Sequence, residues 1–134
     1  MARTTIASQQ FPLAGPSPGV YGASYYPNLP LGAGSANLTM SAADTVNSNY
    51  TAIVEGKTVL LAYNSHTTST FTLTINSVSN VNQRTGDITN YALAALTAAM
   101  FGPFNAAGWN QSAPAGLYFN GTSTNIQFAC LQLP

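Results

Sequence analysis

Residues 70–76 read Thr-Phe-Thr-Leu-Thr-Ile-Asn, and apolar and polar side chains alternate in this stretch without a break. Successive side chains of a β-strand point to opposite faces, so the alternation predicts a strand with one buried and one solvated face. Residues 125–130, Asn-Ile-Gln-Phe-Ala-Cys, alternate in the same way. Residues 57–63, Lys-Thr-Val-Leu-Leu-Ala-Tyr, are apolar at successive central positions, which is typical of a central strand.

Weaker strand candidates lie at 38–40, 50–54, 87–93, 100–104 and 117–119, with turn residues between them. About eight short strands with a turn roughly every ten residues are the pattern of all-β sandwiches and barrels. We therefore expect residues 37–134 to form one all-β domain, a β-sandwich or jelly-roll-like fold.

Residues 90–100, Asn-Tyr-Ala-Leu-Ala-Ala-Leu-Thr-Ala-Ala-Met, are open to two interpretations. Alanine favours a helix, and Leu93, Leu96 and Met100 recur at helical spacing. Against this, a helix of about ten residues is marginal without packing, and Gly102-Pro103 would end it. The sequence leaves strand and helix equally open here.

Residues 1–36 differ from the rest of the chain. Prolines at 12, 16, 18, 27 and 30, with interleaved glycines, exclude a helix or a central strand and predict an extended N-terminal arm. The arm carries much apolar and aromatic surface, so it either lies along its own domain or reaches a neighbouring subunit. We expect the second, with Phe11, Tyr21, Tyr25 and Tyr26 as interface residues.

Charge is the most unusual property of the composition. Charged residues are 4% of the 134, against roughly 25% in an average soluble protein. Such a chain makes a poor nucleic-acid partner, because phosphate binding needs several Lys or Arg contacts. Net charge also keeps copies of a protein apart, so its absence favours an assembled, homo-oligomeric state. The six charges, which sum to zero, are Arg3, Asp44, Glu55, Lys57, Arg84 and Asp87.

The supply of catalytic side chains is small. Cys130 is the only cysteine, which excludes an intrachain disulfide, and the alternation at 125–130 directs it toward the core. A triad of Cys130, His66 and Asp44 or Asp87 is therefore disfavoured. The spacing of His, Cys and carboxylates matches no metal-binding motif. We expect no enzyme activity, no cofactor and no metal.

Three residues outside the arm are candidate partner contacts. Arg84 and Asp87 flank Gly86 in a predicted turn, where Asp87 accepts backbone N–H groups; as two of six charges, they are also candidates for a polar contact. Trp109, the only Trp, follows a Gly- and Pro-containing loop. It either anchors this loop on the core or serves as an interface hot spot.

The C-terminal part resembles a known family. The stretches RTGDITNY (84–91), FGPFNAAGWNQS (101–112) and LYFNGTSTNIQFACLQLP (117–134) resemble small structural proteins of tailed phages, the head decoration or capsid cement proteins. The resemblance covers residues 84–134 and implies a β-sandwich or jelly roll that braces capsomers of the major capsid protein, as a dimer or trimer. It brings no catalytic residues, and the alanine-rich 92–99 segment departs from it.

The resemblance thus implies a protein on the capsid exterior of a virion. The first ten residues lack the apolar run of a secretory signal, and no apolar stretch is long enough to span a bilayer, so we expect synthesis in the host cytoplasm and no membrane partner. Alternatives are another virion part, such as a tail or head-completion protein, and a carbohydrate-binding β-sandwich module, which would present exposed Tyr, Trp and Asn on a concave face. A hydrolase is the third alternative function.

Overall fold

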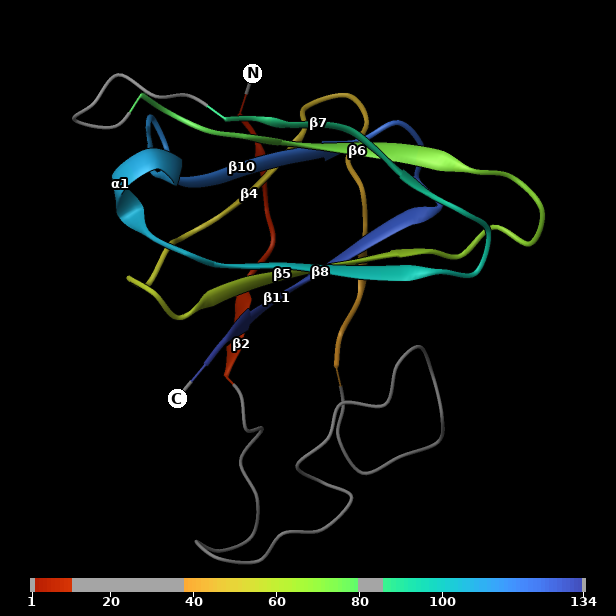
Figure 1. Cartoon of the computed structure of the whole chain (residues 1–134), viewed down its shortest axis with the longest axis horizontal. Coiled ribbons are helices and arrows are strands. Elements are labelled where there is room, and N and C mark those ends of the chain that lie inside the picture. Colours follow the sequence, from red (N-terminus) through yellow and green to blue (C-terminus); the bar gives the residue numbers. More distant parts are fainter. Residues whose placement is uncertain (1, 11–37, 80–85, 134) are drawn as a thin grey trace, which may run out of the picture.

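The computed structural model describes residues 2–10, 38–79 and 86–133. Within these ranges the chain forms eleven β-strands and one short helix, and the strands make two mixed sheets that pack face to face (Figure 1). The predicted all-β sandwich is confirmed. Among the described residues, no helix is long and apolar enough to cross a membrane.

The first sheet has six strands. Five of them follow one path, and the sixth, β9, pairs with β10 beside that path. The pair of β1 and β4 is parallel, whereas β10 pairs antiparallel with both of its neighbours on the path. In spatial order the strands are β1 (Thr4–Thr5), β4 (Asn49–Thr51), β10 (Ala115–Gly121), β6 (Phe71–Asn76) and β7 (Ile88–Leu93), with β9 (Gln111–Ser112) beside β10.

The second sheet has five strands, and the long pair of β5 and β11 forms its centre. Two short strands, β2 and β3, pair with the same edge of β11, one parallel and one antiparallel. A short helix, α1 (Ala106–Trp109), follows β8. In spatial order the strands are β2 (Ser8–Gln10), β11 (Ile126–Gln132), β5 (Thr58–Asn64) and β8 (Ala98–Phe104), with β3 (Ser41–Ala42) beside β11.

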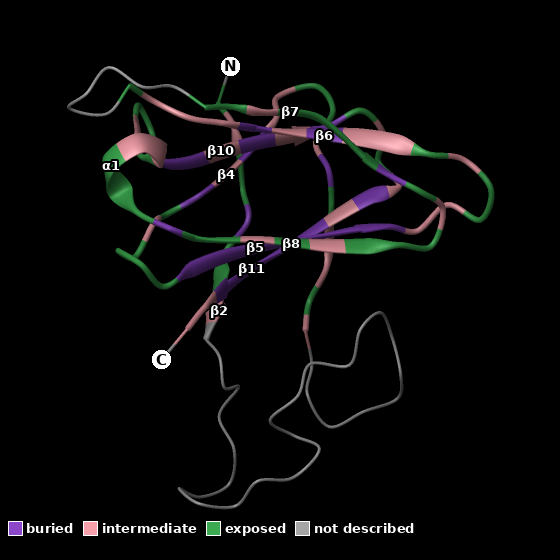
Figure 2. Ribbon diagram, in the orientation of Figure 1, coloured by how far each residue is buried: buried purple, intermediate pink, exposed green. Residues whose placement is uncertain are grey.

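The core lies between the two sheets, where Figure 2 shows the buried residues of β5, β10 and β11. Phe119 of β10 and Phe128 of β11 meet edge to face with their ring centroids 4.8 Å apart. Burial of such a side chain contributes roughly 1.5–3 kcal/mol. The three strands predicted from 57–63, 70–76 and 125–130 supply most of this cluster, which contains Leu60, Ala62, Leu73, Ile75, Leu117, Phe119, Ile126, Phe128 and Cys130.

The helix considered for residues 90–100 is wrong. β7 ends at Leu93, a corner follows, and β8 begins at Ala98. Asn90 and Leu96 have φ values of 51° and 57°, which a right-handed helix excludes. Pairing of β7 with β6 and of β8 with β5 satisfies the backbone instead. The strand predicted at 38–40 is also displaced, because β3 covers Ser41–Ala42.

The predicted boundary between arm and domain needs a correction. Strands β1 and β2 lie inside the range 1–36, yet β1 pairs with β4 and β2 pairs with β11. Ile6, between them, is 4% exposed and belongs to the core cluster. The sandwich therefore includes the segment from Thr4 to Gln10. The rest of the predicted arm, residues 11–36, lies outside the described residues, as do its interface candidates Phe11, Tyr21, Tyr25 and Tyr26.

Candidate functional site

The Asp44 carboxylate organises the turn between β3 and β4. Its Oδ1 accepts the backbone N–H groups of Val46 at 3.0 Å and Asn47 at 2.9 Å, and its Oδ2 accepts the Thr4 hydroxyl at 2.5 Å. These bonds stabilise the charged carboxylate and hold the pKa of Asp44 far below its usual range. Asp44 therefore fastens the N-terminal strand to the sandwich.

The Asp87 carboxylate has a similar role at the base of the 78–86 segment. Its Oδ1 accepts the backbone N–H and the hydroxyl of Ser77, both at 2.7 Å, and these bonds lower the pKa of Asp87. The Ser77 hydroxyl oxygen in turn accepts the Gly86 N–H at 2.8 Å. Asp87 does accept a backbone N–H, but the donor is Ser77, which directly follows β6, and not a residue of the predicted 84–87 turn. Arg84 lies outside the described residues.

The side chains of His66 and Glu55 also accept backbone N–H groups, His66 within its own turn and Glu55 from a residue distant in the sequence. The Nδ1 atom of His66 accepts the N–H groups of Thr68 at 3.1 Å and Ser69 at 2.9 Å. The Oε2 atom of Glu55 accepts the N–H of Ala106 at 2.6 Å, where α1 begins. Both side chains therefore fix the path of a turn or loop.

Cys130 lies in the core, as the alternation predicted. Burial raises the pKa of its thiol to about 12, so the reactive thiolate is scarce at neutral pH. His66, Asp44 and Asp87 each hydrogen-bond to groups other than Cys130, so the structure does not assemble the triad. In the part of the chain that the structure describes, no three His, Cys, Asp or Glu side chains gather as a metal site.

A pocket of about 260 Å³ lies beside β2. The side chains that line it offer aliphatic carbon, one amide group and two hydroxyl groups, and none of them is ionisable. An acid, base or charged ligand set is therefore missing from this lining, which consists of Ile6, Ala7, Gln9, Thr39 and Ser41.

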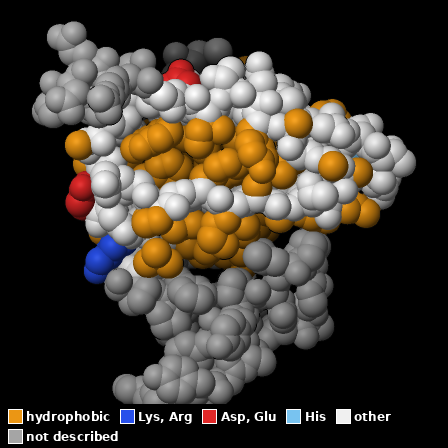
Figure 3. Space-filling model, in the orientation of Figure 1, with side chains coloured by type: hydrophobic (Ala, Val, Ile, Leu, Met, Phe, Trp, Pro, Cys, Tyr) orange, Lys and Arg blue, Asp and Glu red, His pale blue; other side chains and the backbone are white. Residues whose placement is uncertain are grey.

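The most distinctive surface is the side of the sandwich where β7 and β8 end their sheets. We call it the β7–β8 edge and define it by Tyr91, Leu96, Met100 and Phe101. Tyr91, Leu96 and Met100 are 43%, 56% and 60% exposed. Figure 3 shows apolar side chains on both sides of the β8 backbone, with no charged side chain among them. An exposed apolar patch of this kind is typical of an interaction site.

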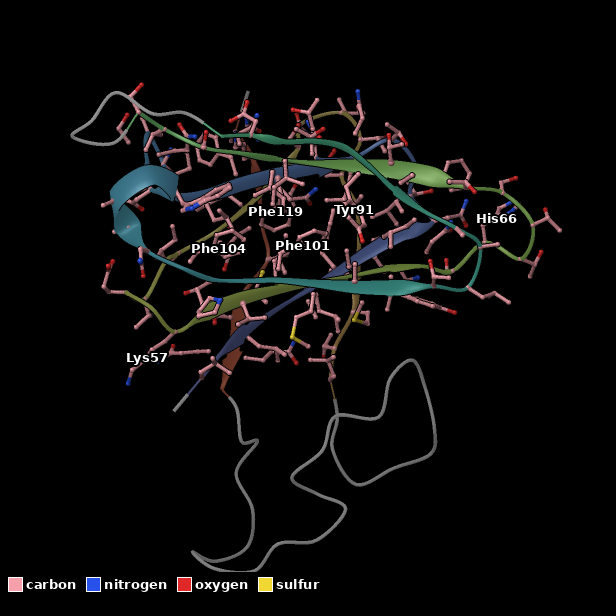
Figure 4. The ribbon with its side chains drawn as sticks, in the orientation of Figure 1. Lys57, His66, Tyr91, Phe101, Phe104 and Phe119 are labelled. Atoms are coloured by element: carbon pink, nitrogen blue, oxygen red, sulfur yellow. The ribbon has the colours of Figure 1, made fainter. Side chains whose placement is uncertain are left out.

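Aromatic side chains fill the gap between the two edge strands. Tyr91 and Phe101 pack edge to face with centroids 5.1 Å apart, and Figure 4 shows both rings between the sheets with Phe104 and Phe119. Trp109 packs on Phe104 at 5.0 Å and is partly buried against the core, as its anchor interpretation predicted. The edge is therefore joined to the core through Phe101, which packs against the core cluster and carries the Tyr91 ring.

The backbone of this edge is poorly suited to pairing with another strand. The register shifts opposite both strands, between Leu73 and Ile75 along β7 and between Thr58 and Leu60 along β8. Pro103 also removes one N–H donor from β8. Natural proteins prevent edge-to-edge sheet extension in two common ways. The first is a bulge or a proline in the edge strand, and the second is a charged side chain on it. Here the second protection is missing, since no Asp, Glu, Lys or Arg follows Asp87 in the sequence.

A second aromatic site lies on the outer face of the six-stranded sheet. Tyr50 and Tyr118 are cross-strand neighbours there, with ring centroids 6.5 Å apart. The Arg3 guanidinium carbon lies 3.9 Å from the centre of the Tyr118 ring, and the Tyr118 hydroxyl donates to the Pro114 carbonyl oxygen at 2.9 Å. One ring face and the hydroxyl of Tyr118 are therefore already occupied within the chain.

The sequence analysis identified Trp109 and Asp87 but missed Tyr91, Leu96, Met100 and Phe101. The available signal was the stretch without charge after Asp87, which contains both edge strands. Comparison of the chain with protein-family models, with curated proteins and with solved structures returned no match.

Proposed function

We propose that this chain is a structural protein of a tailed-phage virion, which binds the exterior of the assembled head and stabilises contacts between capsomers of the major capsid protein. The observation that carries the proposal is the exposed, uncharged, apolar β7–β8 edge. The resemblance of residues 84–134 to head decoration proteins supplies the partner class, and both edge strands lie within these residues.

The mechanism is burial of neutral surface. A stable interface removes about 800 Å² per partner from water, and each Å² of apolar area contributes roughly 25 cal/mol before the costs of association. The bulges and Pro103 direct contact to side chains rather than to strand pairing. In this proposal the protein is a dimer or trimer without catalytic activity, made in the host cytoplasm, and it binds neither nucleic acid nor membrane.

A carbohydrate-binding module is the rival proposal from another functional class. Its best support is the pair Tyr50 and Tyr118 on the outer face of the six-stranded sheet. Sugar rings stack on free aromatic faces, but Arg3 lies over Tyr118. The apolar edge is the stronger candidate because its side chains are exposed and make no comparable polar contact.

Binding of charge variants to phage heads tests the proposal. The double variant Leu96→Lys, Met100→Lys places two charges on the edge, where burial would require their desolvation. Val46→Lys is the matched control. Val46 is 72% exposed and precedes β4, which lies toward the other end of the six-stranded sheet from β7, so the new charge would be far from the β7–β8 edge. Cosedimentation with heads of the encoding phage should show at least a tenfold loss for the double variant, or about 1.4 kcal/mol, and no loss for the control.

Equal binding by the unmodified chain and both variants would contradict the role of the edge. Binding to tails or to the head vertex only would instead support a tail or head-completion protein. Absence of any particle binding, together with glycan binding that Tyr50→Ala abolishes, would support the carbohydrate module.

A further inference from the structure

Strand β5 is buried along its whole length and on both of its faces. Leu60 and Ala62 point into the sandwich and belong to the core cluster. Their neighbours Val59, Leu61 and Tyr63 must point the other way, because side chains alternate along a strand. They are nevertheless only 4%, 2% and 8% exposed. The outer face of the five-stranded sheet is therefore covered over β5.

The covered surface extends onto β11 but not onto β8. In the antiparallel register, Leu131 lies opposite Val59 and Ala129 lies opposite Leu61, so both share the outer face. Their exposures are 4% and 0%. Met100 of β8 lies opposite Leu61 on the other side, and it is 60% exposed. We call the covered surface, Val59, Leu61, Tyr63, Ala129 and Leu131, the outer apolar face.

The described secondary structure does not account for this cover. Figure 1 shows β6, β7 and β10 on the inner side of the five-stranded sheet, and no described strand or helix on its outer side. A sandwich with only two layers leaves its outer faces to water, as the exposed residues of β7 show on the other sheet. The outer apolar face therefore needs a further occupant.

Residues 11–37 begin and end at this sheet. The chain leaves it at the end of β2 and returns just before β3, and both strands pair with β11. The two ends are also joined, since the Gln9 amide donates to the Thr39 carbonyl oxygen at 2.8 Å and accepts the Thr39 N–H at 2.9 Å. Because both ends of the segment are held at the same place, its chain can extend at most about 45 Å away from the sheet before it must turn back. Crossing two strands requires only about 10 Å.

The chemistry of the segment matches the face. Residues 11–37 contain no charged residue, and their prolines favour extended backbone that needs no partner strand. We propose that residues 11–37 pack on the outer apolar face of their own chain. The segment then acts as a third layer of the domain rather than as an arm to a neighbour. This inference does not depend on the proposed function. The apolar side chains available to it are Phe11, Leu13, Val20, Tyr21, Tyr25, Tyr26, Leu29 and Leu31.

Maleimide labelling of a cysteine on the face tests the proposal. Val59→Cys replaces one small apolar side chain by another, and Met100→Cys is the exposed control on the same face. Both cysteine variants are made in two further backgrounds. In the first, the eight apolar residues of 11–37 named above are replaced by serine. In the second, which is the control, Ala14, Ala23, Ala33 and Ala36 are replaced by serine. Native Cys130, buried in the core, reports loss of the whole fold.

We expect slow labelling of Cys at 59 in the native segment, unchanged labelling with the alanine control, and at least tenfold faster labelling with the eight serines. Met100→Cys should react rapidly throughout. Rapid labelling at 59 in the native segment overturns the proposal, as does protection that survives the eight serines while Cys130 stays unlabelled. Protection that falls on dilution overturns it in favour of a second copy.

If the eight serines expose Cys130 as well, the domain has unfolded and a second measurement decides. Tyr63 is replaced by p-benzoylphenylalanine in the otherwise native chain, and ¹⁴N- and ¹⁵N-labelled proteins are mixed before irradiation. Cross-links from 63 to residues 11–37 within one isotope support the proposal. Cross-links between isotopes, or to other parts of the chain only, overturn it.

Discussion

The Asn64 side-chain amide donates a hydrogen bond of 2.9 Å to the Leu93 carbonyl oxygen, and so joins the end of β5 in one sheet to the end of β7 in the other. The same amide lies 2.8 Å from the Ser69 carbonyl oxygen, and its Oδ1 accepts the His66 N–H at 3.0 Å. Asn64 is fully buried. One side chain therefore satisfies backbone groups of both the 65–69 turn and the corner that leads to β8.

Asn64→Ala should lower the free energy of unfolding by about 2–4 kcal/mol, because it leaves several buried backbone groups without partners. Asn110→Ala is the matched control: Asn110 is exposed, and we expect a change within about 0.5 kcal/mol. Urea denaturation measures both. Equal stabilities of the two variants would show that the corner does not depend on Asn64.

The strands that could be predicted are those whose alternation of apolar and polar residues lies within their own short stretch of sequence. Residues 70–76 and 125–130 carry their periodicity in the sequence, and both became strands of the core. The corner at 94–97 could not be predicted in this way. It depends on Asn64, whose amide bonds to Leu93, 29 positions later, and on a positive φ at Leu96 that an alanine-rich stretch does not announce.

The same distinction holds for the candidate site. Trp109 could be identified because a lone Trp after a Gly- and Pro-containing loop has few roles. The exposure of Tyr91, Leu96 and Met100 depends instead on which strands end the sheets. Sheet order follows from pairing between distant residues, so amphipathic patterns in single strands do not contain it.

Stability should fall in acid through two carboxylates. Asp44 and Asp87 have lowered pKa values in the folded protein, because each accepts several hydrogen bonds as the charged form. A group with a depressed folded pKa contributes stability above its unfolded pKa, about 3.9, and that contribution is lost as pH falls toward the folded value. We expect the Tm to decrease between pH 5 and pH 2.5.

The variant Asp44→Asn, Asp87→Asn checks the cause of this decrease. It should be less stable than the unmodified chain at pH 7, since an amide accepts these hydrogen bonds less strongly. Its Tm should also change less between pH 5 and pH 2.5. An equally steep acid decrease in the double variant would assign the effect to other groups.

Trp109 provides a way to separate packing from recognition. Its ring packs edge to face on Phe104 and is partly buried, so Trp109→Ala should cost about 2–3 kcal/mol of stability and Trp109→Phe less. Urea denaturation and head binding are measured on the same preparations. If Trp109→Phe keeps its stability but loses tenfold in head binding, Trp109 acts as an interface hot spot in addition to anchoring its loop.

The last prediction concerns salt and follows from the uncharged edge. If the chain binds heads through the β7–β8 edge, its affinity comes from apolar burial and neutral hydrogen bonds, because no charged residue follows Asp87. Salt screens charges over a Debye length of about 8 Å at physiological ionic strength and about 3 Å at 1 M, whereas apolar burial is hardly weakened. Occupancy on heads should therefore change less than threefold between dilute buffer and about 1 M NaCl. A tenfold fall for the unmodified chain, about 1.4 kcal/mol, would mean that charges such as Arg84 or Asp87 dominate the interface.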